Sequence, residues 1–261
     1  MWKNFNELGW MIFDYDKDIY CWARTARKAI GSSFYEGHRN DLRCGETWFA
    51  GVNFLSNDGR GTYRGVPLAG TSINHICDRF GQCFEKWDQA QISICYPGYP
   101  KPSQDESAAI VNYRRNKFGA HVDGILPVGA TRRRFAKEYY AFILGIPLSK
   151  FNKHAAPLIV WEKSHFIMQD FLSNYYSSFP KTDKEAVDIT EVYQLARKKI
   201  FETCKKKAVW AKVGEAYLLN RLTLHGIRPW TSRGRAETCG RIIAYFRPSL
   251  LADKLWLSNK L

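Results

Sequence analysis

The sequence lacks the features that mark several large protein classes. Its seven cysteines form no Cys-x-x-Cys pair and are odd in number, which argues against both a disulfide framework and a structural zinc site. No apolar run approaches the roughly 18 residues that a membrane-spanning helix needs, and the first residues show no apolar signal core. There is also no internal repeat. These absences predict a soluble, cytoplasmic protein with reduced, mostly buried thiols.

Length and composition favour one folded domain. The chain has 261 residues, 45% of them hydrophobic and 15% aromatic, so it can bury a large core. Its formal net charge is +14, and much of that charge is clustered at 114–117, 132–137, 197–199 and 205–207. Such clusters suit an anionic partner, but solvated basic faces are the more common explanation. The basic clusters are therefore compatible with nucleic acid as a partner but do not favour it. The sequence does not predict the oligomeric state.

The two parts of the chain differ in their hydrophobic pattern. In residues 1–107, apolar residues at helical spacing predict helices over 16–30 and 72–86, within a helical and loop part that packs on the rest. From residue 108 onward, short aliphatic and aromatic runs predict strands, and a helix near 188–204 interrupts them. The expected strands are 108–113, 140–147, 157–161, 208–213, 215–220 and 242–246.

This pattern predicts a fold that is mainly β with flanking helices. Many short strands with one inserted helix fit a sandwich or barrel of antiparallel sheets with helices outside. A jelly-roll barrel meets that description, although periodicity alone does not select it over other sandwiches. We expect a single domain over 1–261 with its barrel core at 108–248.

His121, Asp123 and His225 form the most informative pattern in the sequence. Two histidines and one carboxylate are the ligands that hold non-haem Fe(II) on one face and leave the opposite face open for oxygen and a co-substrate. In extended backbone the side chains of His121 and Asp123, two residues apart, project to the same side. His225 closes a strand-like run. We predict that these three residues are the metal ligands and the catalytic centre.

Arg241 supplies a cation that could bind a dicarboxylate, which the three metal ligands do not provide. It opens a predicted strand, where an inward arginine would be a costly buried charge without a partner. The guanidinium fork binds carboxylates through two parallel hydrogen bonds, so a dicarboxylate such as 2-oxoglutarate would satisfy it. Arg247, at the far end of the same strand, is the alternative.

Two further segments lie between His121 and Arg241. Pro157–His165 contains the pattern Val-Trp-x-x-Ser-His, and Gly214–Leu219 precedes His225. Over residues 108–248 this order of motifs resembles the phytanoyl-CoA dioxygenase-like family of Fe(II)- and 2-oxoglutarate-dependent oxygenases. The resemblance implies a double-stranded β-helix (a jelly-roll or cupin-like barrel), Fe(II) on the triad, 2-oxoglutarate on Arg241, and O2 as oxidant. It also implies hydroxylation of a small-molecule substrate, with release of succinate and carbon dioxide.

The sequence departs from the family at two places. The segment between His225 and Arg241 is longer than in many members, and Ile227 stands where many members carry a small hydroxyl residue that helps to bind the co-substrate. We predict that Tyr113, on the expected strand before His121, replaces that hydroxyl. The arginine-rich segment 128–134, just beyond the ligands, is a candidate lid over an anionic substrate, and a solvated loop is equally compatible with it.

Other functions remain as alternatives. Arg241 and Arg247 bracket five residues, a spacing that resembles the nucleic-acid demethylases of the same superfamily, and the positive charge suits a phosphate backbone. A non-catalytic barrel that binds a ligand or partner is a second alternative. A halogenase is disfavoured, because that chemistry leaves the carboxylate position vacant for a halide and Asp123 fills it.

Overall fold

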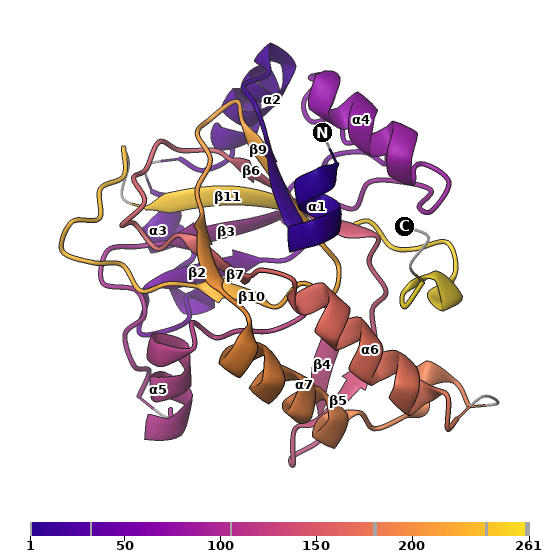
Figure 1. Ribbon diagram of the computed structural model, residues 1–261. Helices are drawn as coiled ribbons and strands as arrows, with labels where there is room; N and C mark the ends of the chain where they lie inside the picture. The colour runs from indigo at the N-terminus through magenta and orange to yellow at the C-terminus, as the bar shows by residue number, and fades with distance from the viewer. Residues whose placement is uncertain (1, 32, 105, 180–181, 238–239, 259–261) are drawn as a thin grey trace.

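The computed structural model describes residues 2–31, 33–104, 106–179, 182–237 and 240–258. Its strands form two antiparallel sheets and a separate hairpin (Figure 1). The large sheet has the order β1-β9-β6-β11-β3-β2, from β1 (Trp10–Phe13), β2 (Trp48–Gly51), β3 (Gln91–Cys95), β6 (Phe142–Pro147), β9 (Ala216–Asn220) and β11 (Arg241–Phe246). The small sheet has the order β10-β7-β8, from β7 (Leu158–Trp161), β8 (Lys206–Val209) and β10 (His225–Ile227). The hairpin pairs β4 (Ile125–Val128) with β5 (Arg133–Ala136).

From β3 onward the chain passes back and forth between the two sheets. After β3, His121 pairs with His225 in an isolated antiparallel bridge and so adds a position to the small sheet. The chain then enters β6 of the large sheet, β7 and β8 of the small sheet, β9 of the large, β10 of the small and β11 of the large. One buried cluster joins Ile143 and Ile243 of the large sheet to Leu158 and Val160 of the small sheet. The two sheets therefore face each other across a shared interior.

Helices cover the outer face of the large sheet. Because strand side chains alternate, β11 turns Arg241, Ile243 and Tyr245 to one face and its even-numbered residues to the other. The even-numbered residues Ile242, Ala244 and Phe246 belong to the same buried cluster as residues of α2 (Lys17–Arg27) and α4 (Thr71–Phe80). Both helices lie on one side of the molecule in Figure 1.

Two more helices cover the outer face of the small sheet. Ile159 and Trp161 of β7 pack in one cluster with residues of α6 (Ser164–Tyr176) and α7 (Thr190–Thr203). The remaining helical elements are α1 (Lys3–Leu8), α3 (Phe34–Gly37) and α5 (Ala108–Asn116), with short 3-10 turns at Arg39–Asp41, Lys184–Ala186 and Asp253–Leu255. No helix in the described ranges is long and apolar enough to cross a membrane.

The fold confirms the prediction of a sheet-rich protein with flanking helices, and the inserted helix near 188–204 is α7. The strand predicted at 108–113 is wrong, because these residues begin helix α5. The Ser107 hydroxyl accepts the backbone N–H of Ile110 and so caps this helix. None of its residues is buried, so its apolar residues belong to a surface helix and not to a core strand. The N-terminal part, expected to be helix and loop, also supplies strands β1, β2 and β3.

His165, the last residue of the Val-Trp-x-x-Ser-His motif, lies in the first turn of α6 and is 4% exposed. Its Nε2 lies 3.2 Å from the backbone oxygen of Asn6, and its Nδ1 has no hydrogen-bond partner in the described part of the chain. Burial lowers the pKa of His165 to about 4. The unfolded chain therefore binds one more proton than the folded chain between about pH 4 and 6.5.

We expect stability to fall as the pH drops through this window, by roughly 3 kcal/mol at pH 4 relative to pH 7 for this group. Denaturant unfolding at both pH values measures the effect. The variant His165→Gln, whose amide nitrogen can still donate to Asn6, should lose correspondingly less stability on acidification. An identical pH dependence in both proteins would show that His165 does not titrate in this way.

Candidate metal centre

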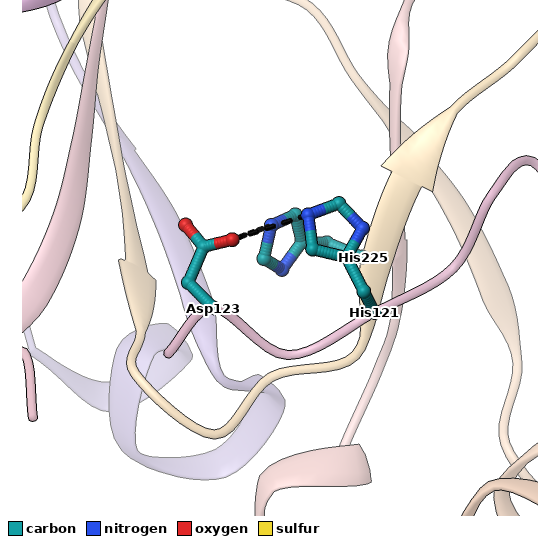
Figure 2. A group of neighbouring side chains, drawn as sticks. All are labelled: His121, Asp123 and His225. Atoms are coloured by element: carbon teal, nitrogen blue, oxygen red, sulfur yellow. Dashed lines mark ion pairs between the residues drawn. The ribbon is translucent and has the colours of Figure 1, made fainter. Parts of the chain in front are cut away.

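The structure brings His121, Asp123 and His225 together, and their ligand atoms all lie within 4.8 Å of one another. The Nε2 atoms of His121 and His225 lie 3.1 and 3.7 Å from Oδ1 of Asp123. Figure 2 shows the three side chains converging on one point. The His121 side chain is 51% exposed, whereas the other two are 8% and 11% exposed. Of the three ligands, His121 is therefore the one that solvent reaches most readily.

The Nδ1 nitrogen of each imidazole already has a hydrogen-bond partner. Nδ1 of His121 lies 2.9 Å from the oxygen of Gly119, and Nδ1 of His225 lies 2.9 Å from the oxygen of Thr223. A carbonyl oxygen only accepts, so each Nδ1 carries a proton and each Nε2 is left with a free lone pair in the neutral ring. Such contacts fix the tautomer and orientation of metal-binding histidines. The donor set therefore fits a metal ion on the two Nε2 atoms and Oδ1 of Asp123.

Backbone pairing places the two histidines side by side. The His121 N–H donates to the His225 oxygen at 2.8 Å, and the His225 N–H donates to the His121 oxygen at 3.0 Å. Gly226 allows this close approach, because a Cβ atom there would lie 2.3 Å from the oxygen of Phe118. Next to His121, the N–H of Val122 donates to the hydroxyl of Tyr193 on α7 at 3.1 Å. The positions of the ligands are thus set by the main chain.

The Val-Trp-x-x-Ser-His segment holds the chain that leads into His225. Val160 pairs with His225 in the small sheet, and the Trp161 N–H donates to the Leu224 oxygen at 3.0 Å. The Ser164 hydroxyl accepts the Leu224 N–H at 2.9 Å. This buried serine therefore fixes the residue before the distal ligand.

The charges at the site favour an ionised carboxylate. Burial raises the pKa of Asp123, but its contacts with the His121 and His225 imidazoles and the charge of Arg247 outweigh burial and hold that pKa well below its usual value. For His121, burial lowers the pKa, but the Asp123 carboxylate raises it more, and the net shift is upward. Asp123 is therefore negatively charged at neutral pH, as a metal ligand must be.

The triad lines a cavity of about 160 Å³ between the two sheets. Its polar or charged lining residues besides the triad include Arg43, Gln91, Ser93 and Arg247. Much of the remaining wall is apolar and includes Trp48, Val52, Ile143, Leu158 and Ile227. Such a cavity, mostly apolar with a few polar groups, is typical of small-molecule sites.

Arg241 and Tyr113 do not line this cavity. Arg241 is 1% exposed on the inner face of β11, where its Nη2 lies 3.6 Å from Cys95 Sγ and its Nε has no hydrogen-bond partner in the described ranges. Tyr113 lies on α5, and its hydroxyl contacts the Ala120 oxygen at 2.6 Å and the Arg197 guanidinium. Those contacts already occupy the hydroxyl that we expected at the co-substrate.

Sequence reasoning missed Tyr245, which lies on β11 and lines the cavity. Its hydroxyl lies 2.8 Å from that of Tyr217, and both rings are near Arg241. The signal was present in the alternation of β11, because Arg241, Ile243 and Tyr245 must share one face if Arg241 points inward. Gly145 leaves room for Tyr217, since a Cβ there would lie 2.2 Å from its ring.

The predicted lid at 128–134 is the tip and second strand of the β4–β5 hairpin. Arg133 forms ion pairs with Asp188 and Glu191 at the start of α7. These ion pairs attach the hairpin to the start of α7, and residues 128–134 do not line the cavity.

No protein-family model and no curated protein sequence matches the chain, but solved structures resemble it. The carbocyclase SnoK of nogalamycin biosynthesis, a non-haem α-ketoglutarate-dependent enzyme, is 12% identical with a TM-score of 0.48, over 97% of this chain and 87% of that one. The α-ketoglutarate-dependent epimerase SnoN is 9% identical with a TM-score of 0.46, over 94% and 80%. EctD from S. alaskensis with bound Fe is 12% identical with a TM-score of 0.43, over 99% and 82%.

We expect Asp123→Ala and His225→Ala to abolish binding of Mn(II), because each removes one of three donors that converge on one point. Calorimetric titration of the metal measures the loss, and circular dichroism checks that the fold is retained. His154→Ala, a histidine outside the site, is the control and should bind as the wild type does. Unchanged metal affinity in either site variant would contradict the assignment of the ligands.

Ser164→Ala should lower the free energy of unfolding by about 1–3 kcal/mol, because it leaves the buried N–H of Leu224 without a partner. Denaturant unfolding measures this loss. Ser177→Ala, an exposed serine just beyond the same helix, should change stability by less than about 0.5 kcal/mol. Equal effects of the two substitutions would show that the Ser164 hydroxyl does not hold the strand.

Proposed function

We propose that this protein is an Fe(II)- and 2-oxoglutarate-dependent dioxygenase that hydroxylates a small-molecule substrate. The observation that carries the proposal is the convergence of two imidazole Nε2 atoms and one ionised carboxylate oxygen at a cavity between two sheets. Two histidines and a carboxylate with open positions are the ligand set of non-haem Fe(II) oxygenases. The small, mostly apolar cavity supports a small-molecule substrate over a polymer.

The course of the chain supports a double-stranded β-helix as the fold. From β3 to β11 the strands enter the large and small sheets in alternation, with β7 and β8 as a consecutive pair at the midpoint of the series. Winding of this kind is the jelly-roll arrangement of two facing antiparallel sheets. This arrangement supports the placement of His121, Asp123 and His225 at a cavity between the two sheets.

For 2-oxoglutarate, we propose that Arg241 binds the distal carboxylate. The Arg241 guanidinium is buried on the inner face of β11, and its unpaired Nε is a donor that an anionic ligand would satisfy. Tyr245, between Arg241 and Arg247 on the same face, takes the role of hydroxyl partner that the sequence assigned to Tyr113. A dicarboxylate between Arg241 and the triad would thus meet the guanidinium at one end and the metal that the triad would hold at the other.

When bound together, the metal and 2-oxoglutarate would supply the oxidising chemistry with O2, giving succinate, carbon dioxide and a hydroxylated product. The protein's own part is placement. His121, Asp123 and His225 occupy one side of the metal position and leave the other side open. The apolar wall, including Trp48, Ile143 and Leu158, excludes water and orients the substrate's C–H bond.

We expect a visible charge-transfer band when Fe(II) and then 2-oxoglutarate are added to the protein without oxygen. His225→Ala should show no band. Arg241→Ala should keep its Fe(II) affinity but require about tenfold or more 2-oxoglutarate for half of the band, since it loses a charge-assisted pair worth roughly 1.5–3 kcal/mol.

Two outcomes would change the proposal. If Arg241→Ala binds 2-oxoglutarate as the wild type does, Arg247 is the residue that binds its distal carboxylate. If the folded wild type gives no band at saturating metal and co-substrate, the protein is a non-catalytic member of this fold.

A further inference from the structure

The two oxygens of the Asp123 carboxylate face different partners. Oδ1 lies 3.1 and 3.7 Å from the histidine Nε2 atoms. Oδ2 lies 3.4 Å from Nη1 of Arg247, the residue that follows β11. The Arg247 side chain is 17% exposed and lines the same cavity as the triad. One oxygen of the ligand is thus directed at the metal position and the other at a cation.

Arg247 is fixed in this position from several elements. Its Nη2 donates to Oε1 of Gln91 on β3, and its backbone N–H donates to Oδ1 of Asp88 at 2.7 Å. Its guanidinium carbon lies 5.6 Å from the centre of the Tyr140 ring. These contacts leave the guanidinium little freedom to turn away from Asp123.

We propose that Arg247 is a positioning residue that limits Asp123 to a single metal-binding oxygen and raises the positive charge of the site for an anionic co-substrate. The inference rests on the proposed function, because it assigns a role at the same metal site. Without Arg247, both carboxylate oxygens would be available to one ion and would occupy two of its positions. With Arg247, the second position stays open for the co-substrate.

The charge of Arg247 acts on the two ligands in opposite directions. A guanidinium in contact with the ligating carboxylate repels a divalent cation and so weakens metal binding. The same charge attracts 2-oxoglutarate, a dianion at neutral pH. If Arg247 had a purely structural role, its removal would damage the site and weaken the binding of both the metal and 2-oxoglutarate.

The test is Arg247→Met, which removes the charge and the side-chain contacts with Asp123 and Gln91 but keeps a long apolar stem. Mn(II) is titrated calorimetrically into the apo protein, and 2-oxoglutarate is then titrated into the Mn(II)-loaded protein. We expect the Kd of Mn(II) to fall by a factor of about three or more relative to wild type. The Kd of 2-oxoglutarate should rise about tenfold. Weaker binding of both ligands, or no change in either, would overturn the inference.

Arg43→Met is the matched control, because Arg43 is another arginine of the same cavity wall and has no contact with Asp123 among those the structure shows. It should leave Mn(II) affinity at the wild-type value, and a tighter Mn(II) site in this variant would assign the effect to general charge and not to Arg247. Arg247→Lys keeps the charge, so its 2-oxoglutarate affinity should lie closer to wild type than that of Arg247→Met.

If Arg247→Met does not fold, Arg247→Gln gives the same test with the same expected signs, because it is uncharged but retains an amide donor. Failure of the proposed function is separable from failure of this inference. A folded wild type that binds neither Mn(II) nor 2-oxoglutarate would overturn the proposed function. A wild type that binds both, with variants in which the two affinities do not move in opposite directions, would overturn only the role of Arg247.

Discussion

The reciprocal backbone hydrogen bonds between His121 and His225 are the contact on which the site depends. Their lengths, 2.8 and 3.0 Å, are those of well-formed hydrogen bonds, and they join segments that are far apart in the sequence. This bridge extends the small sheet beyond β10 and holds the backbone next to Asp123 beside His225. The surrounding features protect this pairing: Gly226 permits the close approach, and Ser164 holds Leu224.

The second constraint is the placing of charge in a mostly apolar interior. Asp123 meets two imidazoles and a guanidinium, and this set keeps the carboxylate ionised despite its burial. Burying a charge is costly unless it is paired, so the site concentrates polar groups at one end of the inter-sheet space. Arg241, at the start of β11, is an exception to this pairing of buried charges, because its Nε has no partner within the described residues. An unpaired buried donor of this kind is what an anionic ligand would stabilise.

The prediction of helices and strands succeeded where apolar residues followed a regular spacing and the element was buried. The α2 helix and strands β6, β7, β9 and β11 lie close to their predicted ranges, whereas α4 begins as predicted but ends at Phe80 and not at residue 86. It failed at 108–113, since Ile110 and Val111 look like strand residues but lie on an exposed or half-buried helix. Burial decides between the two structures, and burial depends on distant parts of the chain. The same limit hid β1, β2 and β3, which become strands by pairing with β9 and β11 or with each other.

The sequence by itself determined the chemical types at the site: two histidines and an aspartate with the spacing of a metal centre, and arginines at both ends of one strand. These follow from local patterns, because side-chain direction in a strand repeats every second residue. Only the tertiary structure decided that Arg247, and not Arg241, touches Asp123, and that Tyr245 rather than Tyr113 lines the cavity. The reason is physical: which side chains meet across the interior depends on the register of the sheets and the packing of helices, and both are settled by contacts between residues far apart in the chain.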